Sequence, residues 1–157
     1  MNKIPMTSSG YEQLQEELKK LINEDRPKII AAIAEARSHG DLSENAEYQY
    51  AKEQQSLIEG KILELESATA LAEIIDVSQL SGDEIKFGAT VEIKDDDTKN
   101  KSTYQIVGEY ESDIENKKLS INSPLARGLI GKSKDDIVEI NSPKGIKSYA
   151  VLSVKYK

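Results

Sequence analysis

The sequence predicts an α+β protein, with an N-terminal antiparallel α-helical coiled-coil hairpin over residues 1–76 and a β-rich domain over residues 77–157. Apolar residues recur at three- and four-residue spacing on both sides of one turn near residue 40, which is typical of two helices packed against each other. From residue 90 onward the apolar period falls to two, which is typical of strands. This change of period marks the domain boundary.

The first helix is predicted to begin after a Ser or Thr N-cap within residues 7–10. Its apolar face is then set by Tyr11, Leu14, Leu18 and Leu21. Pro27 interrupts the pattern, which resumes at Ile29 one position out of phase. Because helical periodicity continues on both sides, we interpret Pro27 as a kink in one long helix, although two separate helices would give the same pattern.

The second helix is predicted from about Ser43 to Ile75. Matching the two helices about the turn brings Arg37 beside Lys52 and Gly60 opposite Ile29, where a missing side chain would let the helices approach. Arg37 and Lys52 have two interpretations. The first is that they balance nearby carboxylates, and the second depends on the family resemblance described below. The carboxylates that would take part are Glu35, Glu47 and Glu53.

The second domain is predicted as a small antiparallel sheet with one short helix. Its strands fall at 90–94, 102–107, 118–122, 137–140 and 148–154, with a turn over 142–145. The helix is predicted over 123–131, because Ser123 is a good N-cap, Pro124 suits the first helical position and Gly131 suits the end.

Charge and composition narrow the classes of partner. Residues 1–76 hold 8 Lys/Arg and 15 Asp/Glu, whereas residues 77–157 hold 13 of each, so the net charge of −7 lies on the helical half. An acidic hairpin is not expected to bind duplex DNA on its own, and a protein with a basic groove or channel is the better partner. The chain has no Cys, which fits a reducing cytoplasm, and shows no signal peptide or membrane span.

The turn between the helices carries two carboxylates, Asp41 and Glu44, and the only histidine, His39. Asp-x-x-Glu at a helix start is a capping-box pattern, which predicts Asp41 as N-cap. The same spacing places both carboxylates on one helix face, and hard oxygen ligands suit Mg²⁺. Two carboxylates fill only part of an octahedral shell, so a partner would supply the rest. The two interpretations are compatible. We interpret His39 as a polar turn residue.

Two motifs carry a resemblance to a known family. Ala36-Arg-Ser-His-Gly-Asp-Leu-Ser-Glu-Asn-Ala-Glu-Tyr48, followed by Ala51-Lys-Glu-Gln-Gln55 and Gly60, resembles the signature of the bacterial Gre transcript-cleavage factors of the GreA type. Ser123-Pro-Leu-Ala-Arg-Gly-Leu-Ile-Gly131, with Val138 and Pro143-Lys-Gly145, is similar to a second signature of this family. One small departure is Asp135-Asp136, where the family commonly has Gly-Asp.

The resemblance implies an accessory factor that is not itself an enzyme. Its hairpin would enter the secondary channel of RNA polymerase, and its FKBP-like C-terminal domain would dock at the channel mouth through Ser123 and Pro124. Asp41 and Glu44 would hold a Mg²⁺ jointly with the polymerase, with Ser43 in reach, to promote cleavage of backtracked RNA. Arg37 and Lys52 would contact the nascent RNA 3′ end. The protein would be a cytoplasmic monomer that contacts nucleic acid only within the complex.

Two other functions are compatible with parts of the pattern. A coiled-coil chaperone or an FKBP-like peptidyl-prolyl isomerase would use the hairpin and the C-terminal fold. One Phe and no Trp leave little to build the aromatic pocket of such an isomerase. An inhibitory relative that only blocks the channel would have altered turn carboxylates, and Asp41 and Glu44 are both present.

Overall fold

The computed structural model describes residues 3–40 and 45–156. Its contacts divide the chain into two compact units. Among the described residues, the first unit contains Glu12–Leu71, and the second combines residues 3–11 with residues 72–156. The second unit therefore includes an N-terminal segment as well as the C-terminal half of the chain. The α+β class predicted from the sequence is confirmed.

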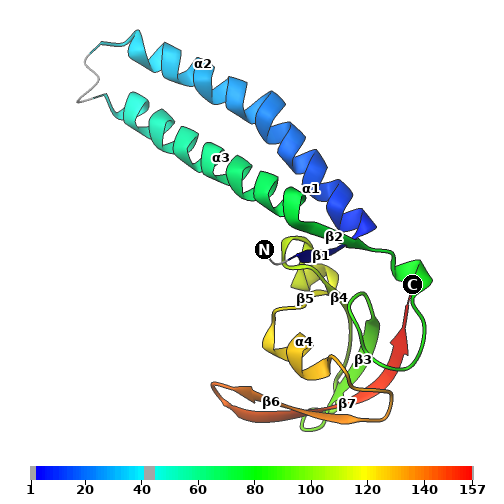
Figure 1. Cartoon of the computed structure of the whole chain (residues 1–157). Helices are drawn as coiled ribbons and strands as arrows, with labels where there is room; N and C mark the ends of the chain where they lie inside the picture. The colour runs from blue at the N-terminus through cyan, green and yellow to red at the C-terminus, as the bar shows by residue number, and fades with distance from the viewer. Residues whose placement is uncertain (1–2, 41–44, 157) are drawn as a thin grey trace. The chain divides into compact units, whose positions relative to one another are not determined.

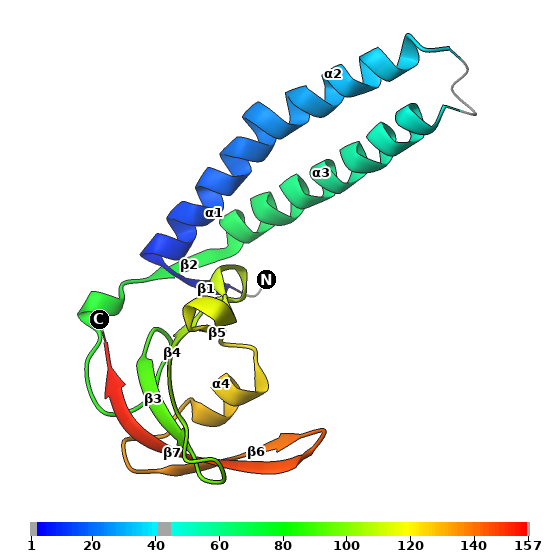
Figure 2. The same ribbon diagram turned by 180° about the vertical axis from the view of Figure 1, so that it is seen from behind.

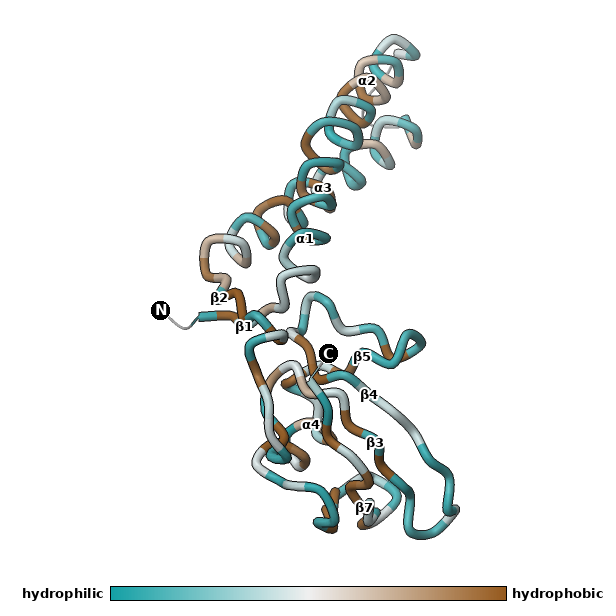
Figure 3. The backbone as a smooth tube through the Cα atoms, turned by 90° about the vertical axis from the view of Figure 1, so that its right-hand side faces the viewer, coloured by the Kyte–Doolittle hydropathy of each residue, from teal (hydrophilic) through white to brown (hydrophobic). Residues whose placement is uncertain are grey.

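The first unit is a helical hairpin (Figure 1). Its first arm consists of α1 (Ser8–Lys20), a π-helical segment η1 (Leu21–Asp25) and α2 (Arg26–Arg37), and its second arm is α3 (Ala46–Leu71). Apolar stretches along the tube in Figure 3 alternate with polar ones, as expected when one side of each helix is buried. The buried side chains of the hairpin are Leu14, Leu21, Ile33, Ala36, Ala51, Ile62, Leu65 and Ala68.

The π-helical segment explains the phase shift in the sequence pattern. Its end is marked by the Arg26 N–H, which donates to the Leu21 carbonyl five residues earlier. A π-turn inserts one extra residue, which is the offset between the apolar residues before Pro27 and those after it. The wider turn also accommodates Pro27, which has no N–H to donate and crowds the preceding turn. The predicted single helix through Pro27 is confirmed.

The second helix is shorter at both ends than predicted. It begins at Ala46 rather than near Ser43, and it ends at Leu71 rather than Ile75. Residues Ala72–Ile75 form strand β2 instead, which pairs in parallel with β1 (Ile4–Thr7). Two consecutive β-branched residues, Ile74 and Ile75, suit a strand, and this pairing supplies partners that a helix pattern does not reveal.

The predicted role of Gly60 is wrong. Gly60 is exposed, and a Cβ at this position would meet nothing within 4 Å. The glycine therefore does not bring the two helices together. Although α3 is the longest described helix, no helix in the part of the chain that the structure describes is long and apolar enough to cross a membrane.

The second unit contains a five-stranded sheet in the order β5-β4-β3-β7-β6 (Figure 2). Neighbouring strands are antiparallel except β4 and β5, which are parallel, so the prediction of an entirely antiparallel sheet needs this correction. The parallel pair arises because two short 3-10 segments, η3 (Glu109–Glu111) and η4 (Ile114–Asn116), carry the chain back before β5 starts. The strands are β3 (Thr90–Asp95), β4 (Lys101–Val107), β5 (Lys118–Ser120), β6 (Ile137–Ser142) and β7 (Gly145–Lys155).

Helix α4 (Pro124–Leu129) packs on this sheet and completes its core. The Ser123 hydroxyl oxygen accepts the Ala126 N–H, and Pro124 occupies the first turn, as predicted. Gly128 lies so close to β6 that an added Cβ would be 2.2 Å from Ile140 Cδ1. The fully buried core residues include Ile85, Ala89, Val91, Ile93, Ile106, Ala126, Leu129, Val138 and Val151.

Candidate functional site

The end of the hairpin is the region that the sequence motifs single out. Helix α2 ends at Arg37, and Gly40 has a φ of +109°, a conformation that glycine adopts far more easily than other residues. His39 lies in the turn, where its Nδ1 is 3.0 Å from Glu47 Oε2, in accord with its predicted role as a polar turn residue. The predicted site residues Asp41, Ser43 and Glu44 lie outside the described residues.

Asn45 joins the ends of the two helices, a role that the sequence analysis missed. Its Oδ1 accepts the Tyr48 N–H at 3.1 Å, which makes Asn45 the N-cap of α3. Its Nδ2 donates to the carbonyl of Ala36 at 2.7 Å, near the end of α2. Asn45 therefore caps α3, whereas the residue predicted from the sequence as N-cap, Asp41, lies outside the described residues. The available signal was an Asn directly before Ala46, since Asn caps helices as well as Asp does.

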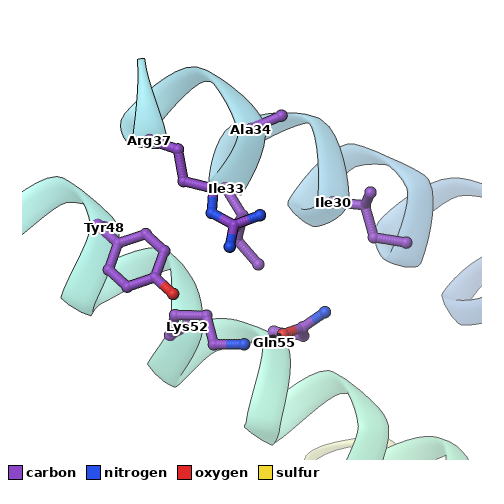
Figure 4. Close-up of a pocket in the computed structure, with 7 residues that line it drawn as sticks. All are labelled: Ile30, Ile33, Ala34, Arg37, Tyr48, Lys52 and Gln55. Carbon is purple, nitrogen blue, oxygen red and sulfur yellow. Dashed lines mark hydrogen bonds between the residues drawn. The ribbon is translucent and has the colours of Figure 1, made fainter. Parts of the chain in front are cut away.

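A pocket of about 300 Å³ lies between α2 and α3 near this end (Figure 4). Arg37 and Lys52 both line it, so the structure brings these two predicted residues together. Figure 4 shows the Arg37 side chain extending from α2 toward α3, where the Tyr48 ring lies beside Lys52. We call this site the Arg37–Lys52 pocket, and its residues are Ile30, Ile33, Ala34, Arg37, Tyr48, Lys52 and Gln55.

The two cations of this pocket are exposed to solvent. The Lys52 ammonium donates to Gln55 Oε1 at 3.2 Å, so its described partner is neutral. None of the ion pairs among the described residues joins Arg37 or Lys52 to a carboxylate. Direct pairing with Glu35, Glu47 or Glu53, the first interpretation of these cations, is therefore not observed. Both cations line a pocket whose other residues include the apolar side chains of Ile30, Ile33 and Ala34.

Further along the hairpin, Arg26 and Glu59 form an ion pair, which contrasts with Arg37 and Lys52. The Arg26 Nε and Nη2 atoms each donate to a Glu59 carboxylate oxygen at 2.8 Å. These hydrogen bonds lower the pKa of Glu59 and raise the pKa of Arg26. The bidentate geometry fixes both side chains. It leaves little positive charge for another ligand, in contrast to Arg37 and Lys52.

The start of α4 holds the two residues predicted for docking. The Ser123 hydroxyl accepts the Ala126 N–H and donates to the Ser120 carbonyl at 2.7 Å, so it is already occupied within the chain. Pro124 is exposed. A cavity of about 280 Å³ adjoins α4, and its lining residues are Ile93, Asp95, Thr98, Asn100, Ser102, Tyr104, Leu125, Lys147 and Tyr149.

A buried carboxylate in the second unit was also missed by the sequence analysis. Glu111 is only 8% exposed, and its Oε1 accepts the N–H groups of Thr7 at 2.9 Å and Gly108 at 3.0 Å. The Thr7 hydroxyl donates to Glu111 Oε2 and accepts the Gly10 N–H at 3.1 Å. We call these four residues the Glu111 clasp. The two hydrogen bonds from Thr7 to Glu111 join residues 104 positions apart, and no local pattern signals that pairing.

No group of three or more metal-ligating side chains occurs among residues 3–40 and 45–156. The carboxylates of Asp41 and Glu44 have the chemistry for Mg²⁺, since it prefers hard oxygen ligands and retains several waters. Two carboxylates would fill only part of the octahedral coordination shell of Mg²⁺.

Comparisons with known proteins point to one family across nearly the whole chain. Residues 4–74 match the family described as "Transcription elongation factor, N-terminal", and residues 80–156 match "Transcription elongation factor, GreA/GreB, C-term". The chain is 60% identical over 156 residues to transcription elongation factor GreA of Chelativorans sp. (strain BNC1), covering 99% of both chains. It is 61% identical over 155 residues to GreA of Rickettsia conorii, covering 99% of this chain and 96% of the relative.

Similar solved structures come from the same group of proteins. GreA factor homolog 1 (Gfh1) of Thermus thermophilus is 25% identical with a TM-score of 0.45, and the match covers 98% of this chain and 99% of that one. The GreA/GreB factor of Nitrosomonas europaea is 20% identical with a TM-score of 0.43, and the match covers 98% of this chain and 100% of that one.

Proposed function

Since the chain belongs to the GreA/GreB family of transcription elongation factors, we propose that it stimulates cleavage of backtracked RNA by RNA polymerase. In this proposal the hairpin enters the secondary channel of the polymerase with residues 37–48 leading. The observation that carries it is the Arg37–Lys52 pocket, where two cations without carboxylate partners in the described residues flank the segment that holds Asp41 and Glu44. The net negative charge of the helical half, residues 1–76, would suit a channel lined with basic residues.

Asp41 and Glu44 are the residues that we propose to hold a Mg²⁺ ion jointly with the polymerase. A Mg²⁺ bound there supplies charge stabilisation and an activated water for phosphoryl transfer. Ser43 lies between them in the sequence and would orient that water through its hydroxyl. Because the chain contributes only part of the coordination, it acts as an accessory factor and is not an enzyme by itself. We expect weak Mg²⁺ binding by the isolated protein.

The remaining parts of the chain have supporting roles in this proposal. Arg37 and Lys52 neutralise phosphates of the RNA that backtracking displaces, so contact with nucleic acid occurs within the complex. Pro124 would contact the polymerase through its exposed ring, whereas Ser123 would set the start of α4 through its two hydrogen bonds. We propose that the protein acts as a monomer in the cytoplasm, the compartment in which its polymerase partner is found.

The peptidyl-prolyl isomerase alternative gains one observation from the structure. Tyr104 and Tyr149 line the cavity beside α4, so the second unit does contain an aromatic-lined pocket. The same cavity holds an ion pair, in which Lys147 Nζ is 3.7 Å from Asp95 Oδ2. Charged groups in the pocket disfavour a dry proline site, because burying them against an apolar ligand costs free energy. We expect no acceleration of prolyl isomerisation in a tetrapeptide assay.

The test of the proposed function uses a stalled, backtracked elongation complex. The wild-type protein should release short 3′ RNA fragments, and the double variant Asp41→Asn with Glu44→Gln should release almost none while still binding polymerase. Both changes remove negative charge but preserve size, and a neutral amide is a poor ligand for a hard cation. Glu53→Gln is the matched control and should cleave normally. Cleavage by the double variant at the wild-type rate would contradict the mechanism.

A further inference from the structure

We propose that the Arg37–Lys52 pocket binds one nucleotide of single-stranded RNA. The base would lie against Tyr48 and the apolar wall formed by Ile30 and Ile33, and the phosphate would lie between the two cations. This inference rests on the proposed function for the source of the RNA, which is the strand displaced by backtracking. It goes beyond phosphate contact, because it assigns a base-binding surface to residues that phosphate contact alone does not need.

The first observation is the apolar wall of the pocket, which Ile30 and Ile33 of α2 form. Ile30 is a large hydrophobic residue, yet it remains 51% exposed. An exposed apolar wall inside a concave site is available to a flat apolar ligand face. A phosphate would gain nothing from this wall, whereas a nucleobase would cover it.

The Tyr48 ring is the second observation. It lines the same pocket from α3 and lies beside Lys52 in Figure 4. The Asn45 cap, which accepts the N–H of Tyr48 itself, fixes the backbone from which the ring projects. Unstacked bases of single-stranded RNA stack on aromatic rings and on guanidinium planes, and Arg37 supplies such a plane across the pocket.

The cations are the third observation. Gln55 accepts a hydrogen bond from the Lys52 ammonium at 3.2 Å, which holds this charge along the pocket edge. The volume of about 300 Å³ is at the lower end of ligand pockets and suits one nucleotide rather than a duplex. A net charge of −7 opposes general binding of nucleic acid, so short-range stacking would have to add to the charge contact.

The experiment measures binding of small ligands to the full-length protein by NMR titration or calorimetry, with no polymerase present. Adenosine 5′-monophosphate should bind about fivefold or more tightly than ribose 5-phosphate, because only the former has a base to stack. Equal affinity for the two would overturn the proposal and leave only a phosphate contact. The trinucleotide ApApA should bind at least as tightly as the mononucleotide. Failure of ApApA to bind, while adenosine 5′-monophosphate binds, would overturn the assignment to an RNA strand and indicate a site for a free nucleotide.

Variants locate the binding surface. Tyr48→Leu should abolish the preference for adenosine monophosphate over ribose 5-phosphate, and Tyr48→Phe should retain it because the ring remains. Tyr50→Leu is the matched control, since Tyr50 is on the same helix, 64% exposed and outside the pocket. Lys52→Ala should weaken both ligands, whereas Lys61→Ala should weaken neither. Equal losses from the Tyr48 and Tyr50 changes would contradict the proposal. Because these titrations lack polymerase, their failure is separate from failure of transcript cleavage.

Discussion

The Glu111 clasp and the Arg37–Lys52 pocket hold charged side chains in opposite ways. In the clasp, a buried carboxylate accepts hydrogen bonds from Thr7 and Gly108, and Gly10 leaves space for it, because a Cβ there would be 2.0 Å from Glu111 Oε2. In the pocket, two exposed cations have no carboxylate partner among the described residues. A charge whose hydrogen bonds are satisfied within the chain stabilises the fold, whereas an exposed charge that lines a pocket is available to a ligand. Substitutions in the clasp should therefore cost more unfolding free energy than substitutions of the pocket cations.

The largest loss of stability is expected for Glu111→Ala. This change removes the acceptor of the Thr7 N–H, the Thr7 hydroxyl and the Gly108 N–H, all in a buried site. Leaving such donors unsatisfied costs roughly 1–3 kcal/mol of unfolding free energy. Urea unfolding is the measurement. Glu115→Ala on a nearby exposed position is the control and should change stability by less than about 0.5 kcal/mol. Equal losses of unfolding free energy from the two changes would contradict a stabilising role for the Glu111 clasp.

A moderate loss is expected for Asn45→Ala, which removes the cap of α3 and the hydrogen bond to the Ala36 carbonyl. Loss of an N-cap costs about 1 kcal/mol. Asn45→Asp separates the two contacts, because aspartate still accepts the Tyr48 N–H but has no N–H for the Ala36 carbonyl. It should therefore lose less stability than Asn45→Ala. Thermal unfolding followed by circular dichroism measures both. Full stability of Asn45→Ala would show that the two helix ends need no such link.

A smaller and pH-dependent loss is expected for Glu59→Gln. The Arg26 hydrogen bonds lower the pKa of Glu59, so this pair stabilises the folded chain while Glu59 is ionised. The contribution is present above the ordinary Glu pKa and disappears as the pH falls through the lowered value. The difference in melting temperature between wild type and Glu59→Gln should therefore be positive at neutral pH and vanish in acid. A difference that grows on acidification would contradict the sign.

The smallest change in stability is expected for Arg37→Ala combined with Lys52→Ala. Both side chains are exposed and lack carboxylate partners in the described residues, so the unfolding free energy should move by less than about 0.5 kcal/mol. Crosslinking of the protein to the RNA 3′ end in a backtracked complex should nevertheless weaken. A large loss of helicity with unchanged crosslinking would instead show that these two cations stabilise the fold and do not contact RNA.

The sequence alone determined most of the architecture, because its strongest signals are local and periodic. The apolar spacing predicted the two helices, and the phase shift near Pro27 corresponds to the π-helical segment Leu21–Asp25. Period-two alternation predicted the strands, and Ser123 with Pro124 predicted the start of α4. Matching the helices about their turn brought Arg37 to Lys52. These features depend on neighbours within a few turns or strands, which is the range over which sequence patterns operate.

Only the tertiary structure decided the features that join distant residues. The strand Ala72–Ile75 leaves the helical pattern because Ile4–Thr7 offers a parallel partner almost seventy positions away. Glu111 looks like any surface acid in the sequence, and its burial follows from Thr7, 104 positions earlier. In each case the stabilising contact forms between segments that folding brings together, so its free energy is not visible in either segment alone.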